Sequence, residues 1–284
     1  MTAQLIDGLA LASQKLQSLK QKIETLRLTH PQPGLATLLV GDDPASRIYI
    51  RNKARACAEA GVCSIHHTLP ANSTFEEVVE KIESLNQDPL VHGLLMQLPL
   101  PPHLDAKKLT QRIDRRKDVD GFNWQNLGAL VEGASGLRPC TPTAIMAMLE
   151  SQKIPIKGAH AVVLGRSTIV GKPVALMLVE RGATVTICHS QTRALEAMTR
   201  QADILVVAIG KPRLVGAHMV KAGAAVIDVG INRLADGKIC GDVDFEALKE
   251  QAGWLTPVPG GVGPMTVAML VENTLQAYCA LIEK

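Results

Sequence analysis

Tyr49 and Lys53 are the two side chains whose types and spacing best suit chemistry on a flat substrate. They are four residues apart in a predicted helix, so they lie on one face of it. An aromatic ring beside an amine offers a surface for stacking and a group that can carry a proton. Taken alone, the stretch favours a plainer alternative, a half-buried tyrosine beside a solvated lysine.

The residues around this pair predict a strand followed by a helix. Residues 35–40 form an apolar run that is typical of a buried strand. Asp43 can cap the helix with its carboxylate, and Pro44 suits the first helical position. Gly61 can end the helix in the left-handed conformation.

The rest of the N-terminal half predicts an alternation of strands and helices. Further strands are expected at residues 62–69 and 90–96, and helices at 9–28 and 74–86. The second of these helices begins with a capping-box pattern, formed by Thr74 and Glu77. This alternation indicates a parallel α/β sheet, in which ligands bind outside the carboxyl ends of the strands.

Three polar loops are expected at that edge of the sheet, at residues 41–53, 97–102 and 118–122. By the rule for parallel sheets, the three loops line one crevice. The convergence favours a functional role for Tyr49 and Lys53 over the plainer alternative.

A second α/β unit is predicted to begin near His160, after a helix that runs from Pro139 to Glu150. Its expected strands are residues 161–164, 184–188, 203–209 and 224–229. Glycines follow three of these strands, at positions 165, 210 and 230. That pattern is typical of a dinucleotide-binding sheet.

The loop that begins at Gly165 is the candidate phosphate-binding loop. Ser167 and Val170 occupy the places of the later two glycines in the usual dinucleotide fingerprint, so the motif alone is weak. Its position between a strand and a helix strengthens it, because an open helix N-terminus binds pyrophosphate. The second strand ends without an acidic residue, and Ser190 and Arg166 can accommodate a 2′-phosphate, which favours NADP over NAD. The alternative is a loop that binds nothing.

Residues 256–266 form a second unusual loop, with three glycines and three prolines in eleven positions. So little side-chain bulk lets a flat ring approach the main chain closely. A helix from about Met265 to Ile282 is expected to follow.

Composition limits the class of protein. A chain of 284 residues with 46% hydrophobic residues predicts two domains of ordinary size. The net charge of +3 is small, and acidic and basic residues are interspersed along the chain. This charge pattern does not indicate a surface that binds nucleic acid. The basic run at residues 112–117 is interrupted by Asp114 and followed by Asp118, and we expect it to be a solvated loop.

The six cysteines are scattered, and none has metal-ligand spacing with a histidine, so no metal site is predicted. Neither a signal peptide nor a long apolar segment is evident in the sequence. We therefore expect a cytoplasmic protein with free thiols and no membrane contact.

Seven ordered motifs then point to one family. They lie at residues 40–53, 97–101, 117–122, 139–142, 165–173, 228–232 and 257–266. With these motifs the chain resembles the bifunctional methylenetetrahydrofolate dehydrogenase/cyclohydrolase (FolD) family along nearly its whole length. The family uses a serine-containing glycine loop like the one here.

The resemblance implies an α/β fold with two domains and an active site in the cleft between them. The folate-binding catalytic domain would be residues 1–140, with helix 265–284 packing back on it. Residues 141–264 would form the Rossmann-type NADP-binding domain. The family is usually dimeric through its cofactor domains.

The resemblance also implies the reaction and its residues. Methylenetetrahydrofolate would be oxidised with NADP, and the methenyl product hydrolysed to 10-formyltetrahydrofolate. Lys53 would be catalytic, Tyr49 would stack on the folate, Gln97 would contact the lysine and Asp120 would hold the pterin. Further substrate contacts are implied for Leu98, Gly261 and Pro264. Cofactor contacts are implied for Gly165, Arg166, Ser167, Ser190 and Ile231.

Three alternatives compete with this interpretation. Short-chain dehydrogenases also use Tyr-x-x-x-Lys, but there the motif follows the glycine loop, whereas here it precedes it in a separate domain. A dehydrogenase without cyclohydrolase activity and a non-catalytic folate- or NADP-sensing protein are the others. The presence of Tyr49, Lys53 and Gln97 together favours both activities. A lysine can catalyse the hydrolysis only when burial or a nearby cation lowers its pKa toward neutrality.

Overall fold

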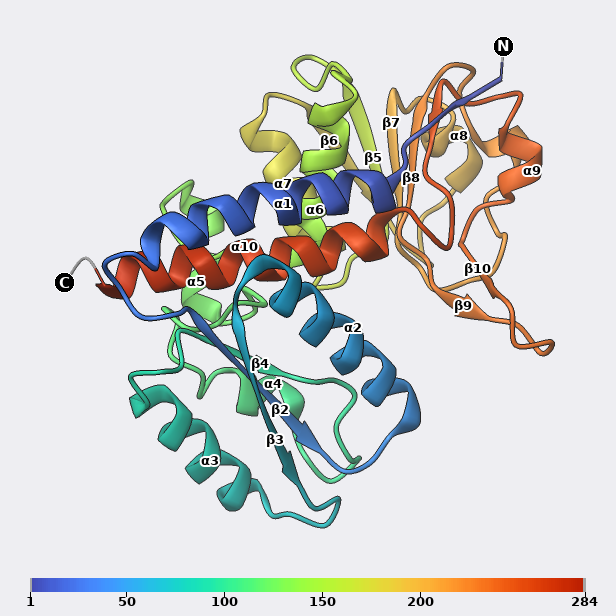
Figure 1. Ribbon diagram of the computed structural model, residues 1–284. Helices are drawn as coiled ribbons and strands as arrows, with labels where there is room; N and C mark the ends of the chain where they lie inside the picture. Colours follow the sequence, from blue (N-terminus) through green and yellow to red (C-terminus); the bar gives the residue numbers. More distant parts are fainter. Residues whose placement is uncertain (1, 283–284) are drawn as a thin grey trace. The chain divides into compact units, whose positions relative to one another are not determined.

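The computed structural model describes residues 2–282, which form two compact α/β units (Figure 1). One unit comprises Met1–Ala12 and Thr141–Thr266, as far as these are described, and we call it the nucleotide unit. The other comprises Ser13–Cys140 and Val267–Lys284 within the same limits, and we call it the catalytic unit. Both units contain parallel sheets, so the expected fold class is confirmed.

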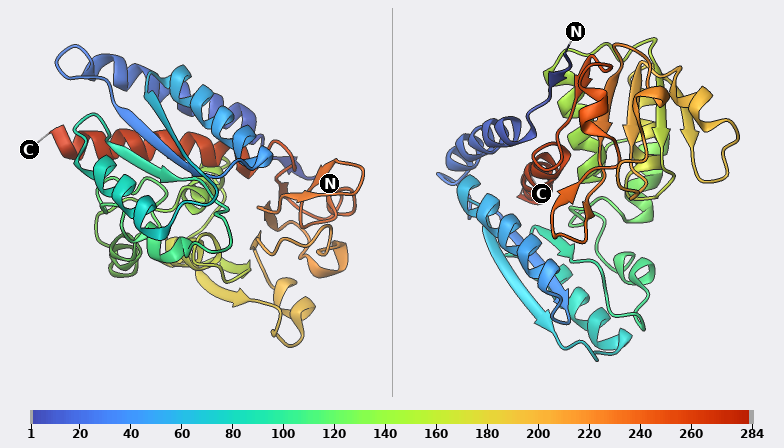
Figure 2. Two further views of the ribbon diagram at one scale, coloured as in Figure 1. Left: turned by 90° about the horizontal axis from the view of Figure 1, so that it is seen from below. Right: turned by 90° about the vertical axis from the view of Figure 1, so that its right-hand side faces the viewer.

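The catalytic unit is built on a three-stranded parallel sheet with the order β3-β2-β4. Its strands are β2 (Gly34–Val40), β3 (Cys63–Leu69) and β4 (Gly93–Met96). Its helices are most of α1 (Gly8–Leu26) and α10 (Val262–Ile282), with α2 (Pro44–Ala60), α3 (Phe75–Gln87), α4 (Ala106–Thr110) and α5 (Trp124–Glu132). Figure 1 and the left view of Figure 2 show α2 (blue) and α3 (teal) on opposite sides of the sheet.

The order of these strands places a switch point at β2. The chain leaves β2 toward β3 and then crosses to β4 on the other side, so the loops after β2 and β4 diverge. Alternate residues of β2, namely Ala36, Leu38 and Val40, pack with α3 in a buried core. The switch point is therefore held by a packed sheet.

The helix caps of α2 and α3 form at the residues that the sequence predicts. Asp43 caps α2, accepting a hydrogen bond from the Ser46 backbone N–H at 2.7 Å, and Gly61 ends the helix with φ of 84°. Thr74 and Glu77 form the expected capping box of α3.

The nucleotide unit contains a six-stranded sheet, parallel throughout, in the order β1-β11-β8-β7-β5-β6. Its strands are β1 (Gln4–Leu5), β5 (His160–Leu164), β6 (Thr184–Cys188), β7 (Ile204–Val207), β8 (Ala225–Asp228) and β11 (Trp254–Leu255). Its helical elements are α6 (Cys140–Ser151), α7 (Gly171–Glu180), α8 (Leu195–Thr199), η1 (Ala217–Met219) and α9 (Phe245–Leu248). The switch point of this sheet lies between β5 and β7.

Two features of the nucleotide unit differ from the sequence expectation. Residues 2–12 group with this unit rather than with residues 13–140, since β1 adds a parallel edge strand beside β11. A strand of two residues is too short to show the alternation of apolar and polar residues that identifies a strand, so the pairing of β1 with β11 was not predicted. An antiparallel hairpin of β9 (Asn232–Arg233) and β10 (Ile239–Cys240) was also missed.

Helix α10 corrects the expectation that the chain has no long apolar segment. Its 21 residues are long and apolar enough to cross a membrane by length and composition. Just over half of its most apolar stretch is buried within the protein, as in the core helix of a soluble domain. The helix begins at Val262, three residues before the expected start, and the last two positions of the expected helix 265–284 lie outside the described residues.

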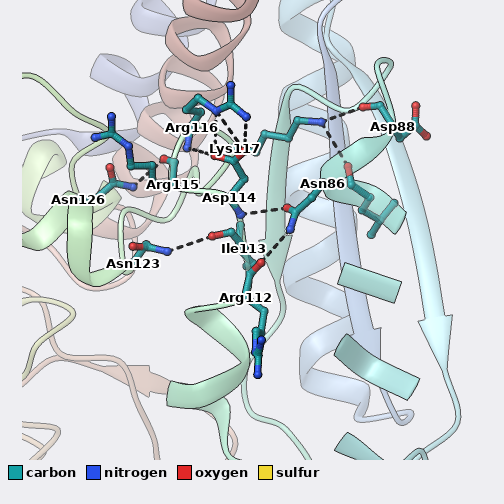
Figure 3. Close-up of polar contacts among 11 residues, drawn as sticks. Asn86, Asp88, Arg112, Ile113, Asp114, Arg115, Arg116, Lys117, Asn123 and Asn126 are labelled. Atoms are coloured by element: carbon teal, nitrogen blue, oxygen red, sulfur yellow. Dashed lines mark hydrogen bonds and ion pairs between the residues drawn. The ribbon is translucent and has the colours of Figure 1, made fainter. Parts of the chain in front are cut away.

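The basic run at residues 112–117 is only partly the solvated loop that we expected (Figure 3). Arg112 and Arg115 are exposed, but Lys117 is buried, and its amine donates to the carbonyl of Asp88 at 2.8 Å. That carbonyl lies at the end of α3, where main-chain acceptors have no helical partner, which explains why a lysine is buried here. Side chains of Asn86, Asn123 and Asn126 hold the backbone of the loop.

Candidate active site

An amine and an amide meet at the carboxyl edge of the catalytic sheet. The Nζ atom of Lys53, on α2, donates to Oε1 of Gln97 at 3.0 Å. Gln97 follows β4 and is buried, and its own Nε2 donates to the Leu98 carbonyl at 2.7 Å. Because the Gln97 backbone N–H also donates to Leu38 of β2, the amide is fixed in place and holds the amine.

Tyr49 lies one turn before Lys53 on α2, with 45% of its surface exposed. The first turn of this helix is fixed, because the buried Ser46 hydroxyl also donates to Asp43 at 2.8 Å. Leu98 is exposed on the loop after Gln97, and its peptide bond to Pro99 is cis. The ring of Tyr49 is thus available to a planar ligand on the helix that carries the amine.

Asp120 brings a carboxyl group to the same site. Burial raises the pKa of Asp120 to about 6, the nearby Lys53 ammonium opposes this shift, and the Asp118 carboxylate adds to it. Asp118 itself is buried and accepts hydrogen bonds from the Asn123 backbone N–H and the Asn126 side chain at 2.7 and 3.0 Å. The structure therefore brings amine, amide and carboxyl together.

The turn that carries Asp120 is held from α10. Nδ2 of the buried Asn273 donates to the carbonyls of Val119 and Arg138, each at 2.8 Å. The Cys140 thiol donates to the same Val119 carbonyl at 3.1 Å. Sequence reasoning missed Asn273, although one asparagine in an apolar helix is a signal, since a buried amide needs partners.

The glycine loop of the nucleotide unit lies at the switch point between β5 and β7. Gly165 has φ of 132°, and a Cβ atom there would lie 2.3 Å from the Ala208 carbonyl oxygen. The Ser167 hydroxyl accepts from the backbone N–H groups of Val170 and Gly171, each at 3.2 Å. Ser167 thereby supports the start of α7, where the usual fingerprint has only glycine.

The other expected cofactor residues also lie at carboxyl ends of strands. Arg166 and Ser190 are exposed after the neighbouring strands β5 and β6, which the Gly165 backbone N–H links by donating to Cys188. Ile231 is exposed after β8. Two neighbouring strand ends with a cation and a hydroxyl suit a phosphate group.

The glycine- and proline-rich loop is packed against the start of α1 within the nucleotide unit. The Leu9 backbone N–H donates to the Gly260 carbonyl at 3.1 Å, and a Cβ atom on Gly8 would lie 1.8 Å from the Gly261 carbonyl oxygen. Gly261 is itself buried, and Pro264 lies in the first turn of α10. The backbone of this loop is therefore fixed.

Comparison with known proteins gives the family context for these two sites. The catalytic-domain model of the tetrahydrofolate dehydrogenase/cyclohydrolase family matches residues 6–120. The model of that family's NAD(P)-binding domain matches residues 139–281.

Individual relatives match over almost their full length. The chain is 57% identical to the bifunctional protein FolD of Nitrosospira multiformis over 277 residues, which cover 98% of this chain and 96% of that protein. It is also similar to the crystal structure of the bifunctional FolD enzyme from Campylobacter jejuni, with a TM-score of 0.96, 47% identity, and 98% and 99% of the two chains covered.

A third relative has a ligand in its structure. The FolD enzyme of Trypanosoma brucei, complexed with NADP cofactor and an inhibitor, has a TM-score of 0.96 and 38% identity, and the match covers all of both chains. Because two family models and full-length relatives agree, the chain belongs to the tetrahydrofolate dehydrogenase/cyclohydrolase family.

Proposed function

We propose that Lys53 transfers the proton in the hydrolytic half of this bifunctional methylenetetrahydrofolate dehydrogenase/cyclohydrolase. The dehydrogenase half converts 5,10-methylenetetrahydrofolate to the methenyl compound, and the cyclohydrolase half converts that compound to 10-formyltetrahydrofolate. The observation that carries the proposal is the hydrogen bond from Lys53 to the buried Gln97, beside the carboxyl group of Asp120.

The hydrolytic step requires one proton to move twice. Water attacks the methenyl carbon, and one of its two protons passes to the amine of Lys53, which takes part in this step in its unprotonated form. The bond from that carbon to N5 then breaks as the amine returns the proton to N5. The second proton of the water leaves the hydroxyl group to solvent, which gives the formyl C=O on N10 and releases the one net proton that the positive charge of the methenyl compound requires. Gln97 accepts a hydrogen bond from the amine and fixes its position during both transfers.

Three other side chains are proposed to place the folate. The exposed ring of Tyr49 stacks on the pterin, one helical turn from the amine. Asp120 is mostly ionised at pH 7.5, because its pKa is about 6, so it accepts hydrogen bonds from the ring N–H groups of the pterin. Leu98, Gly261 and Pro264 are proposed to contact the substrate as well.

The nucleotide unit is proposed to hold NADP through Gly165, Arg166, Ser167, Ser190 and Ile231. The loop fits this group, since Gly165 lets two strand ends approach closely and the start of α7 faces the loop. When bound, NADP supplies the acceptor for the hydride of the dehydrogenase step. Arg166 and Ser190 are proposed to bind its 2′-phosphate. That the two units face each other across the reacting groups stays a prediction.

The experiment is the Lys53→Met variant, assayed separately for each activity. We expect the hydrolysis of methenyltetrahydrofolate to fall about 100- to 10,000-fold, while the affinity for NADP measured by calorimetry is unchanged. Hydrolysis by Lys53→Met at the wild-type rate would refute the role of Lys53. Wild-type protein that accumulates the methenyl compound without hydrolysing it would instead favour a dehydrogenase alone.

We also propose that the protein is a cytoplasmic homodimer that associates through its nucleotide unit. Four buried cysteines, Cys57, Cys140, Cys188 and Cys240, are free thiols, which suits a reducing compartment. The dimer rests on the family resemblance. Light scattering on the purified protein tests it, and a monomer at micromolar concentration would contradict it.

A further inference from the structure

Two buried carboxylates of the nucleotide unit belong to neither of the sites described above. Asp228 is the last residue of β8, and Asp242 follows β10, and both are almost completely inaccessible to solvent. A buried carboxylate is unfavourable unless hydrogen bonds satisfy its oxygens, so each of these residues needs several donors.

Asp242 binds three consecutive backbone amides. Its Oδ2 atom accepts from Ile209 and Gly210 at 2.7 and 2.9 Å, and its Oδ1 atom accepts from Lys211 at 2.8 Å. Successive amides that converge on one point form a concave anion site, and here a carboxylate of the protein fills it. The loop of residues 209–211, which leaves β7, is thus tied to Asp242.

The same carboxylate also holds the β9–β10 hairpin. Nδ2 of Asn232, at the start of β9, donates to Oδ1 of Asp242 at 2.8 Å. One side chain therefore joins the segment after β7 to the segment after β8. These two strands are neighbours in the sheet.

Asp228 in turn fixes the main chain of Asp242. It accepts hydrogen bonds from the backbone N–H groups of Gly230, Asp242 and Val243 at 2.9, 2.9 and 3.1 Å. Burial raises the pKa of Asp228 to about 6. A Cβ atom on Gly241 would lie 1.7 Å from Oδ2 of Asp228, so only glycine fits there. The two carboxylates form one connected network.

This network holds segments that border the switch point. The residue before the clamped loop, Ala208, is in contact range of Gly165 in the glycine loop. Dinucleotides bind outside the carboxyl ends of strands at such a point. A displacement of residues 209–211 would therefore change the surface that a dinucleotide meets.

We propose that Asp242 is a positioning residue for NADP, which clamps the 209–211 loop and Asn232 at the carboxyl ends of β7 and β8. The inference rests on the binding of NADP by this unit and adds a determinant of cofactor affinity that does not touch the reacting atoms.

Asp242→Asn is the informative variant, because an asparagine has the same size. The amide keeps one acceptor oxygen and turns its NH2 group toward backbone N–H donors, so about half of the four hydrogen bonds are lost. We expect the KM for NADP to rise about 10- to 100-fold, with the KM for methylenetetrahydrofolate unchanged. Hydrolysis of methenyltetrahydrofolate, which uses no NADP, should keep the wild-type rate.

Asp236→Asn is the matched control, since Asp236 is exposed in the turn of the same hairpin and pairs with Lys238. We expect this variant to keep the wild-type KM for NADP. If Asp242→Asn lowers thermal stability but leaves that KM unchanged, the role of Asp242 is structural only and the proposal is overturned. An equal rise in both KM values would overturn it as well.

A second variant covers the case in which Asp242→Asn does not fold. Asn232→Ala removes one donor of the clamp and leaves the buried carboxylate its three amides. We expect the same selective rise in the KM for NADP at a smaller magnitude, and an unchanged KM would count against the clamp. Wild-type enzyme without NADP-dependent activity would instead contradict the proposed function, so the two failures are distinguishable.

Discussion

The carboxyl group of Asp120 should make the folded protein less stable than an amide at that position. Its pKa of about 6 lies about two above the ordinary value for an aspartate, which corresponds to about 3 kcal/mol. That value already includes the attraction of the Lys53 ammonium. Because Asp120 is only partly buried, screening by water reduces the expected effect to about 1–2 kcal/mol. We expect Asp120→Asn to stabilise the enzyme by this amount at pH 7.5 while it weakens folate binding.

The effect of Asp120 has a defined pH window. Between about pH 4 and pH 6 the folded protein holds a proton on Asp120 that the unfolded chain has released, so this group lowers the free energy of unfolding as the pH rises. Above the pKa of Asp120 in the folded protein, the decrease in the free energy of unfolding is complete. Below about pH 4, Asp120 causes no decrease. Asp228 has a similar pKa and titrates in the same window, so only a difference between wild type and variant isolates Asp120.

Urea unfolding at pH 7.5 and pH 4.5, followed by circular dichroism, measures this difference. The gain from Asp120→Asn should be largest at pH 7.5 and should shrink at pH 4.5. A variant that is less stable than wild type at pH 7.5, or a gain that is equal at both pH values, would refute the claim that burial controls this carboxyl group.

Three further predictions concern residues that hold the two sites. Asn273→Ala should lower the free energy of unfolding by about 2–4 kcal/mol, because two buried carbonyls lose a donor; a loss below 1 kcal/mol in urea unfolding would contradict its role in the Asp120 turn. Gly165→Ala should weaken NADP binding about tenfold or more, since its methyl group would meet the Ala208 carbonyl and the backbone would be strained at positive φ; calorimetry checks this, and unchanged affinity would argue against the loop. Asp43→Ala should cost about 1 kcal/mol of stability through the lost cap of α2, and thermal unfolding should show a lower Tm with no change in cofactor affinity.

Features with local causes were predictable from the sequence. The cap at Asp43, the left-handed end at Gly61 and the capping box of α3 each depend on a few neighbouring residues, and all were expected at these positions. The longer strands of both sheets, β2 to β8, were also expected at their positions, since apolar runs mark strands that pack in a core. From the rule for parallel sheets, the loops after β2 and β4 were expected at one edge, where Lys53 and Gln97 are hydrogen-bonded.

Features set by distant partners were not predictable. Asp228 and Asp242 are fourteen residues apart, and nothing in either segment indicates that one carboxylate holds the backbone of the other. Lys117 looked like part of a solvated basic run, and only the end of α3 explains its burial. The two-residue strands β1 and β11 owe their pairing to the sheet they join, and residues 2–12 were placed with the other unit for that reason.

The serine in the glycine loop has a consequence for the entropy of cofactor binding. Its hydroxyl already holds the N–H groups of Val170 and Gly171 at the start of α7. In a loop made of glycine alone, these amides have no hydrogen-bond partner before the phosphate binds. The backbone of such a loop therefore loses its conformational entropy when the cofactor binds. Here much of the ordering is complete when the chain folds, so the arriving dinucleotide meets a preformed turn and less of its binding free energy is consumed in organising the protein.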